Sequence, residues 1–145
     1  MATMEMHANR NLRPRSLPDG TRRGVDNFFS FAHGSKPNWW SEDVPFAHDA
    51  FAVYENTPGS RRDAIVFTEH LLVVLYDHRS VDIPFDNIAR LVPPPKEPLT
   101  SSLEVVLRSS HAARIPVNPP EAAFDLYRFL LSAVGEISRR RGDVG

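Results

Sequence analysis

Residues 64–92 have the sequence AIVFTEHLLVVLYDHRSVDIPFDNIARLV, and the prediction of the fold starts from them. They form three apolar runs separated by short polar corners: Ala64–Thr68, Leu71–Tyr76 and Val81–Val92, the last with a kink at residues 86–87. The runs are rich in Val, Ile, Leu, Phe and Tyr and are too short for typical helices. Since turn-forming residues lie between them, the stretch predicts an antiparallel meander.

The third run carries a proline at an informative position. Val81, Ile83 and Phe85 alternate with Asp82 and Pro84, which is the period expected of a strand. Proline has no N–H to donate to a neighbouring strand. We therefore expect this strand to lie at the edge of its sheet or to bend at Pro84.

Further strands are predicted on both sides of the meander. On the amino-terminal side, Phe51–Tyr54 predicts a strand with its first and third residues on one face, and residues 56–63 predict a hairpin loop. On the carboxyl-terminal side, a stiff proline-rich connector at residues 93–98 comes first. Residues 102–108 and 113–117 then alternate between apolar and polar side chains, so they predict a second hairpin.

A helix is predicted near the carboxyl end, over residues 119–140. Asn118 is a suitable N-cap, and the prolines that follow it, with Glu121 in the first turn, are typical of a helix start. Apolar residues recur at helical spacing on one face, namely Ala123, Leu126, Tyr127, Leu130, Ala133, Val134 and Ile137. The opposite face carries Asp125, Arg128, Ser132 and Glu136. The helix is therefore amphipathic, and we expect its apolar face to cover the open end of the sheet.

Together these elements predict an α+β fold. The expected architecture is a bent antiparallel sheet, or partly open barrel, of about six or seven strands, capped by one C-terminal amphipathic helix. We expect this domain to span residues 49–141. The chain of 145 residues is long enough for one ordinary domain. The sequence contains no cysteine, so disulfides and thiolate metal sites are excluded and the fold depends on packing.

Residues 1–24 are expected to form a flexible tail, because they contain several arginines and few residues able to fill a core. An alternative is an arginine arm that grips a phosphate-rich or acidic partner. The segment lacks the apolar stretch of a secretory signal, and the longest apolar run of the chain, Leu71–Tyr76, is far shorter than the roughly 20 residues that span a bilayer. We therefore expect a cytoplasmic protein.

Residues 25–48 are unusually aromatic. Such side chains are costly to leave in water, since each can bury about 150–250 Å². One interpretation is that the segment folds back over an open end or edge of the sheet. The other is an exposed aromatic patch that docks a protein partner. On the second interpretation the partner-binding residues are Phe28, Phe29, Phe31, Trp39 and Trp40.

The sequence contains no specific catalytic pattern. It has no phosphate-binding glycine loop, no HExxH pair and no glycine-flanked nucleophilic serine. The nearest candidate is a small hydrolase site built from His70, Asp77 and His78, although such corner residues ordinarily form solvated turns. We expect no enzyme activity, no cofactor and no metal. The formal net charge of -1 gives no overall basic field, so no nucleic-acid partner is expected.

Residues 67–91, FTEHLLVVLYDHRSVDIPFDNIARL, resemble the small bacterial pleckstrin-homology-like (PH-like) and GRAM-like domains. The nearest match is IPFDNI at residues 83–88, and the resemblance covers about residues 49–138. It implies a sheet of short antiparallel strands followed by one C-terminal helix. It also implies a binding module rather than an enzyme, because members of this group are mostly non-enzymatic.

The resemblance also bears on the arginines. In phosphoinositide-binding members of the group, basic residues cluster in and beside the first hairpin loop, and Arg61 and Arg62 stand at a comparable place. A second arginine cluster lies at the carboxyl end, so the residues that could hold an anion or an anionic lipid are Arg61, Arg62, Arg139, Arg140 and Arg141. Asp63 adds a negative charge beside the loop, so we expect protein binding through a sheet edge or the helix groove in preference to lipid binding.

Three functions follow as expectations. The first is an interaction module that binds a protein partner, as an adaptor or as an inhibitor of the immunity-protein type, or that forms a homo-oligomer. The second is peripheral binding to anionic membrane lipids through the arginines. The third is a small hydrolase.

Overall fold

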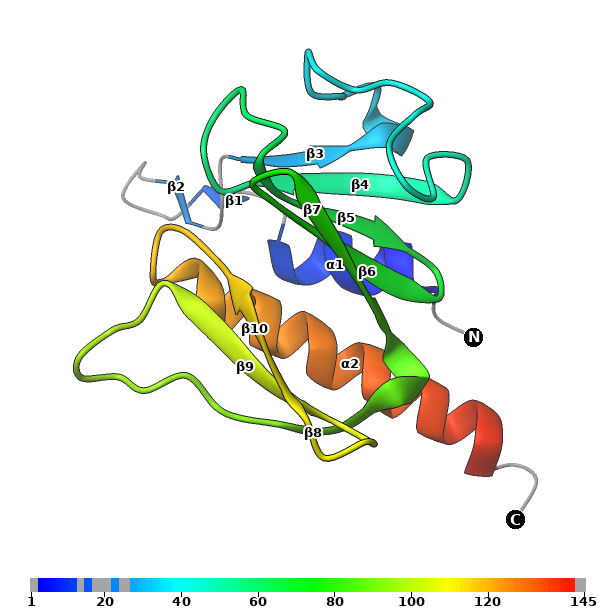
Figure 1. Ribbon diagram of the computed structural model, residues 1–145, viewed down its shortest axis with the longest axis vertical. Helices are drawn as coiled ribbons and strands as arrows, with labels where there is room; N and C mark the ends of the chain where they lie inside the picture. The colour runs from blue at the N-terminus through cyan, green and yellow to red at the C-terminus, as the bar shows by residue number, and fades with distance from the viewer. Residues whose placement is uncertain (1–2, 13–14, 17–21, 24–26, 143–145) are drawn as a thin grey trace.

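The computed structural model describes residues 3–12, 15–16, 22–23 and 27–142 (Figure 1). It contains a five-stranded and a three-stranded antiparallel sheet, with a long C-terminal helix. The predicted fold class, α+β and mostly β with a helical cap, is therefore confirmed.

The larger sheet, called the first sheet, has the strand order β3-β4-β5-β6-β7. Its strands are β3 (Phe28–Ser30), β4 (Ala50–Glu55), β5 (Asp63–Thr68), β6 (Leu71–Tyr76) and β7 (Arg79–Pro84). The second sheet has the order β10-β9-β8, with β8 at Ile88–Leu91, β9 at Ser102–Leu107 and β10 at Ala112–Pro116. The remaining elements are α1 (Met4–Leu12), β1 (Arg15–Ser16), β2 (Arg22–Arg23), η1 (Phe31–His33), η2 (Phe85–Asn87) and α2 (Ala122–Gly142).

The predicted meander forms β5 to β8 and connects the two sheets. β7 is the terminal strand of the first sheet, as its proline predicts. At the predicted kink the chain makes the short helix η2 and enters the second sheet as β8. Phe85, in η2, is buried with its ring centroid 5.8 Å from that of Phe129 in α2. The connection between the sheets is thus packed directly against the C-terminal helix.

The main core lies between the inner face of the first sheet, the second sheet and the two helices α1 and α2 (Figure 1). Phe67 stands at its centre, with its ring centroid 5.8 Å from Phe28 and 5.2 Å from Phe129, both in edge-on geometry. Such aromatic pairs stabilise by about 0.5–1.5 kcal/mol beyond the area that they bury. The predicted role of α2 as a cover for the sheets is confirmed.

Two details of the predicted strand β4 and helix α2 are wrong. Phe51 and Val53 do not share a face, because the pairing of β4 with β5 shifts by one residue between Ala50 and Ala52. As a result, Phe51 points into the main core and Val53 points to the outer face of the sheet. The helix α2 begins at Ala122 instead of residue 119, since residues 119–121 form turns closed by i to i−3 hydrogen bonds.

The aromatic segment covers the outer face of the first sheet, where it forms a second, smaller core. Its buried members are Val44, Val53, Ala64, Val66, Val73 and Leu75, with Phe29, Phe31, Trp39, Trp40, Ala47, Ala50 and Leu71 packed against them. The indole Nε1 of Trp39 donates a 2.6 Å hydrogen bond to the buried carboxylate of Glu55. The segment therefore folds back on the first sheet in two ways: Phe28–Ser30 pairs with the edge of β4 as strand β3, as one interpretation predicts, and the residues after it cover the outer face of the sheet.

The prediction of a flexible tail over residues 1–24 is wrong for residues 4–12. These residues form α1, and Met4, Ala8 and Leu12 are buried in the main core. Their spacing of four residues places them on one side of a helix. The structure otherwise describes only Thr3 and the short strands β1 and β2 among the first 24 residues. Three apolar side chains suffice for α1 because α2 and β5 offer it a prepared apolar surface.

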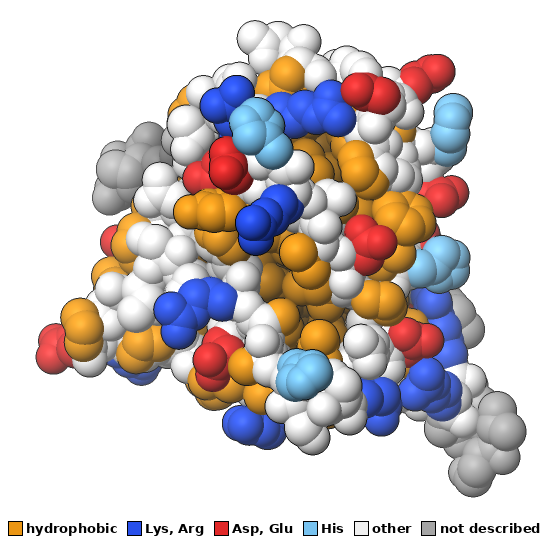
Figure 2. All heavy atoms as spheres, viewed as in Figure 1, with side chains coloured by type: hydrophobic (Ala, Val, Ile, Leu, Met, Phe, Trp, Pro, Cys, Tyr) orange, Lys and Arg blue, Asp and Glu red, His pale blue; other side chains and the backbone are white. Residues whose placement is uncertain are grey.

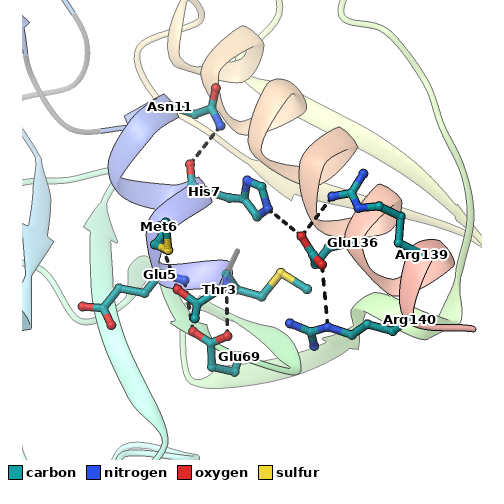
Figure 3. A network of polar contacts seen from close by, with 10 residues as sticks. Thr3, Glu5, Met6, His7, Asn11, Glu69, Glu136, Arg139 and Arg140 are labelled. Atoms are coloured by element: carbon teal, nitrogen blue, oxygen red, sulfur yellow. Dashed lines mark hydrogen bonds and ion pairs between the residues drawn. The ribbon is translucent and has the colours of Figure 1, made fainter. Parts of the chain in front are cut away.

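Polar contacts hold α1 at its N-terminus and in its middle (Figure 3). The carboxylate of Glu69, in the β5–β6 turn, accepts hydrogen bonds from the backbone N–H groups of Met4 (2.9 Å) and Glu5 (3.0 Å). An acidic side chain at a helix N-terminus satisfies free N–H groups and complements the helix dipole. In the middle of α1, Nε2 of His7 lies 3.2 Å from Oε1 of Glu136 in α2.

Glu136 was predicted on the solvent side of α2, and this is wrong because α1 covers it. The side chain is almost fully buried, and Arg139 donates a 2.9 Å hydrogen bond to it. The hydrogen bond from Arg139, followed by that from His7, holds the pKa of Glu136 below its usual range. Glu136, which lies on the polar face of α2, is thus a residue through which α2 contacts α1.

Candidate binding groove and arginine pocket

A groove of about 660 Å³ lies between the two terminal strands β7 and β10. Figure 2 shows hydrophobic side chains along the hollow between the two sheets. Its lining is Val74, Tyr76, Arg79, Val81, Ile83, Ser101, Ser102, Ala113, Arg114 and Pro116. One wall therefore comes from the inner face of β6 and β7, and the other from the second sheet.

The groove exists because the inner face of the first sheet continues beyond the main core. Val74 and Ile83 are buried in that core, whereas the next inner-face residues toward the β6–β7 turn are open to solvent. Tyr76 is 58% exposed and Val81 is 53% exposed. Val81 lies directly across from Val74 in the β6–β7 ladder. The apolar inner face of β6 and β7 thus extends beyond the area that α2 and the second sheet cover.

The outer edge of β7 has free backbone groups beside this groove. The two-residue turn at residues 77–78 makes Tyr76 and Arg79 a hydrogen-bonded pair, so alternate residues of β7 direct their N–H and C=O groups toward β6. The N–H groups of Ser80 and Asp82 consequently point away from the sheet. No strand in the described part of the chain pairs with this edge. Pro84 ends the row of donors.

The facing edge of β10 is shorter. Leu107 N–H donates to the carbonyl of His111, and Val117 N–H donates to that of Ser101, which fixes the alternation of the ladder. Ala112 and Arg114 therefore direct their backbone groups outward. The carbonyl of Pro116 is already occupied, because it accepts a 2.7 Å hydrogen bond from the side-chain amide of Asn56. β7 is thus the more open of the two edges.

Two arginines give the groove its charge. Arg114 lies directly across from Glu104 in the β9–β10 ladder, so its charge is partly balanced. Arg79 lies across from Tyr76, an uncharged residue. Within the described residues, no hydrogen bond or ion pair of the Arg79 side chain is found. The groove therefore presents an apolar floor with two arginines, of which Arg79 has no acidic residue across from it in its ladder.

Arg79 also belongs to a second, smaller pocket of about 380 Å³ on the other side of the β6–β7 turn. Its lining is Pro45, Arg61, Arg62, Leu75, Asp77, His78, Arg79 and Ser80. We call it the arginine pocket. Arg61 forms a 3.0 Å ion pair with Asp43. Hydrogen bonds from Ser41 and then from Arg61 hold the pKa of Asp43 below its usual range.

No family model, curated protein or solved structure matches this chain.

The structure divides the predicted anion-binding arginines into two groups. Arg61 and Arg62 lie together in the arginine pocket, as their place in one loop predicts. Arg139, Arg140 and Arg141 lie at the far end of α2, away from that loop (Figure 1). There they form ion pairs: the first two with Glu136, and Arg141 with Asp86 at 3.5 Å. The five residues do not form one site.

The predicted aromatic docking residues lie away from the groove. Phe28 is 8% exposed and belongs to the main core, so its side chain has almost no surface for a partner. Phe29, Phe31, Trp39 and Trp40 are half-buried on the outer face of the first sheet, whereas the groove is on the inner face. Phe31 and Trp40 pack on each other with ring centroids 4.8 Å apart. Their first role is to cover the sheet.

The residues of the hydrolase hypothesis do not come together. Asp77 and His78 are neighbours in the arginine pocket, with Nε2 of His78 3.9 Å from Oδ1 of Asp77. His70 lies in the turn at the opposite end of β6, a strand of six residues that spans roughly 20 Å. Among the described residues, no three His, Cys, Asp or Glu side chains are close enough to hold a metal ion. Nor does any described helix have the length and apolar character needed to cross a bilayer.

The groove residues were not identified from the sequence. Tyr76 and Val81 continue apolar runs that are otherwise buried, so their pattern is that of core residues. The one available signal is Pro84, which marks β7 as a terminal strand and so indicates which apolar run has an open edge. The opposite wall comes from β10, and only the packing of the two sheets brings it close.

Proposed function

We propose that this protein is a cytoplasmic, non-enzymatic PH-like interaction module that binds a protein partner. The succession of antiparallel strands followed by one C-terminal helix, together with the motif at residues 83–88, supports the PH-like assignment. The partner supplies an extended segment that adds to the open edge of β7 and fills the groove. In the cell the module serves as an adaptor or as an inhibitor of its partner.

The observation that carries the proposal is the coincidence of a free strand edge with an exposed apolar groove. Edge strands are templates for a further strand, and many protein interactions use them in this way. The exposed side chains of Tyr76 and Val81 add apolar area that a bound segment can bury. Backbone hydrogen bonds to Ser80 and Asp82 then contribute affinity, and the groove contributes selectivity.

Affinity capture with matched variants tests this proposal. The tagged wild-type protein is compared with Val81→Asp and with the control Leu131→Asp, which adds the same charge at a position of similar exposure (48%) on α2. We expect a protein from an extract of the native host to be retained by the wild type and the control and lost from Val81→Asp. Identical retention by all three would contradict binding through the groove.

A homo-oligomer is the special case in which the partner segment comes from a second copy. Sedimentation equilibrium over a range of concentrations recognises it, because only self-association makes the apparent mass rise with concentration. The same Val81→Asp variant would then remain monomeric.

Peripheral binding to anionic lipids is the second candidate, favoured by the gathering of Arg61, Arg62, Arg79 and His78 around one pocket. Positive side chains near a surface attract anionic headgroups, and salt screens this attraction. Sedimentation with phosphatidylserine vesicles at low and moderate salt tests it. Arg62→Glu should abolish binding and Arg90→Glu, an exposed arginine on β8, should retain it. Equal sedimentation with neutral vesicles would exclude this function.

A further inference from the structure

We infer that the segment accepted by the groove has a two-residue alternation: an acidic side chain across from Arg79 and apolar side chains across from Val81 and Ile83. This inference rests on the proposed function, because it specifies the chemistry of the strand that adds to β7. It concerns the sequence of the partner segment and not the fact of binding.

The geometry of strand addition sets the alternation. Arg79, Val81 and Ile83 point to the inner face of the first sheet and line the groove, whereas Ser80 and Asp82 point to the outer face. In a paired strand, side chains directly across from each other have Cβ atoms about 4.5–5.5 Å apart. Every second side chain of the segment therefore enters the groove beside an identified residue of β7.

The charges of β7 differ between its two faces. On the groove side, Arg79 lacks a described ion-pair partner, so a carboxylate across from it forms a charge-assisted hydrogen bond. On the outer side, Asp82 is exposed and would repel an acidic residue across from it. The segment is therefore not acidic throughout. It is acidic at the groove-side position beside the β6–β7 turn and basic or uncharged across from Asp82.

The apolar positions follow from the shape of the groove. Val81 is half-exposed, and Val74 and Ile83 continue its surface into the main core. A volume of about 660 Å³ accommodates two bulky aliphatic or aromatic side chains. Ala113 and Pro116 on the opposite wall are apolar and small, so they leave this space open.

The length of the paired segment is limited by the ends of β7. The β6–β7 turn closes one end at residues 77–78, and Pro84 interrupts the donors at the other. Five residues of the segment consequently face residues 79–83. Starting from Pro84, their order is apolar, basic or uncharged, apolar, polar and acidic.

A displayed library of random 12-residue peptides, selected on immobilised protein, tests the inference. Selections on the wild type, Arg79→Glu and Val81→Asp are run in parallel, with Arg90→Glu as the charge control. We expect wild-type peptides to share the apolar-x-apolar-x-acidic pattern in one chain direction, and peptides from Arg79→Glu to carry Lys or Arg in place of the acid. The control should select the wild-type pattern.

The quantitative test measures the affinity of two synthetic peptides. One is a selected peptide with its acidic residue, and the other is the same peptide with Lys in place of that residue. The acidic peptide should bind Arg79→Glu roughly tenfold more weakly than the wild type, and the Lys peptide should recover that loss. Arg79→Gln should bind the acidic peptide with an affinity between those of the wild type and Arg79→Glu. Such a graded loss shows that the charge at position 79, and not misfolding, is responsible. Thermal unfolding of each variant provides the check on folding.

The remaining outcomes separate the inference from the proposed function. Peptides that are lost on Val81→Asp but show no preference for an acid would overturn the inference and leave groove binding intact. Peptides enriched equally on Val81→Asp, or no enrichment at all, would overturn both.

Discussion

Nε2 of His7 lies 3.2 Å from Oε1 of Glu136, and both side chains are almost completely buried (Figure 3). The two residues come from the opposite ends of the chain and join α1 to α2. Arg139 donates to the same carboxylate oxygen. A buried polar group without a hydrogen-bond partner costs free energy, so this contact favours one position of α1 on the domain.

Replacing the imidazole should loosen α1. In His7→Ala, Glu136 loses its partner from α1, and we expect the melting temperature to fall by several degrees. Amide hydrogen exchange should accelerate over residues 4–12 more than in the sheets. Arg10→Ala, at an exposed position of the same helix, is the control. Equal melting temperatures for the two variants would show that the contact between His7 and Glu136 does not stabilise α1.

The lowered pKa of Glu136 predicts a dependence of stability on pH. A carboxyl whose folded pKa lies below its usual value of 4.5 contributes stability that is complete above that value and is lost as pH falls through the folded pKa. Denaturant unfolding of the wild type and Glu136→Gln between pH 6 and about pH 3 measures it. The wild type should be the more stable at pH 6, with a difference that shrinks below pH 4.5. A difference constant with pH would contradict the linkage.

The cover over the outer face of the first sheet depends on one indole. Trp39→Phe retains an aromatic ring but removes the donor to the buried carboxylate of Glu55. We expect a loss of about 1–3 kcal/mol in the free energy of unfolding. Trp40→Phe is the matched control, because it changes the neighbouring indole in the same small core. If the control lost as much as Trp39→Phe, ring volume rather than the hydrogen bond would be responsible.

Asn56 connects the β4–β5 loop to the end of the second sheet. Its side-chain amide donates to Asp63 and to the carbonyl of Pro116, and its side-chain oxygen accepts a 2.8 Å hydrogen bond from the backbone of Asn118. Asn56→Ala should destabilise the protein by about 2–4 kcal/mol, since several buried groups lose partners at once. Chemical denaturation measures this effect. Asn38→Ala, at an exposed position, should change stability little.

Local patterns predicted strands β4 to β10, whereas β3 was not predicted as a strand. The meander and the hairpin of β9 and β10 follow from apolar alternation between turn residues, and the terminal position of β7 follows from Pro84. The patterns failed where a second element determines the outcome. The residues of α1 contain too few apolar side chains to predict a buried helix, and the surface that receives them is built by α2 and β5.

In the candidate site, too, the sequence predicts what neighbouring residues do, and the packing of distant elements decides the rest. Arg61 and Arg62 could be placed together because they are neighbours in the sequence, whereas their association with Arg79 requires two turns to meet. Tyr76 and Val81 have the pattern of core residues, and they are exposed because the second sheet diverges from the first at that end.

Residues 64–92 thus specify, through their alternation and turns, which segments pair and in what order, because hydrogen bonding between neighbouring strands is a local property. Whether an apolar face ends in the core or in a groove depends on how two sheets and two helices meet. That depends on the shape and volume of all the packed side chains together. The meander can therefore be predicted from the sequence, whereas the groove beside β7 arises only when the sheets and helices pack together.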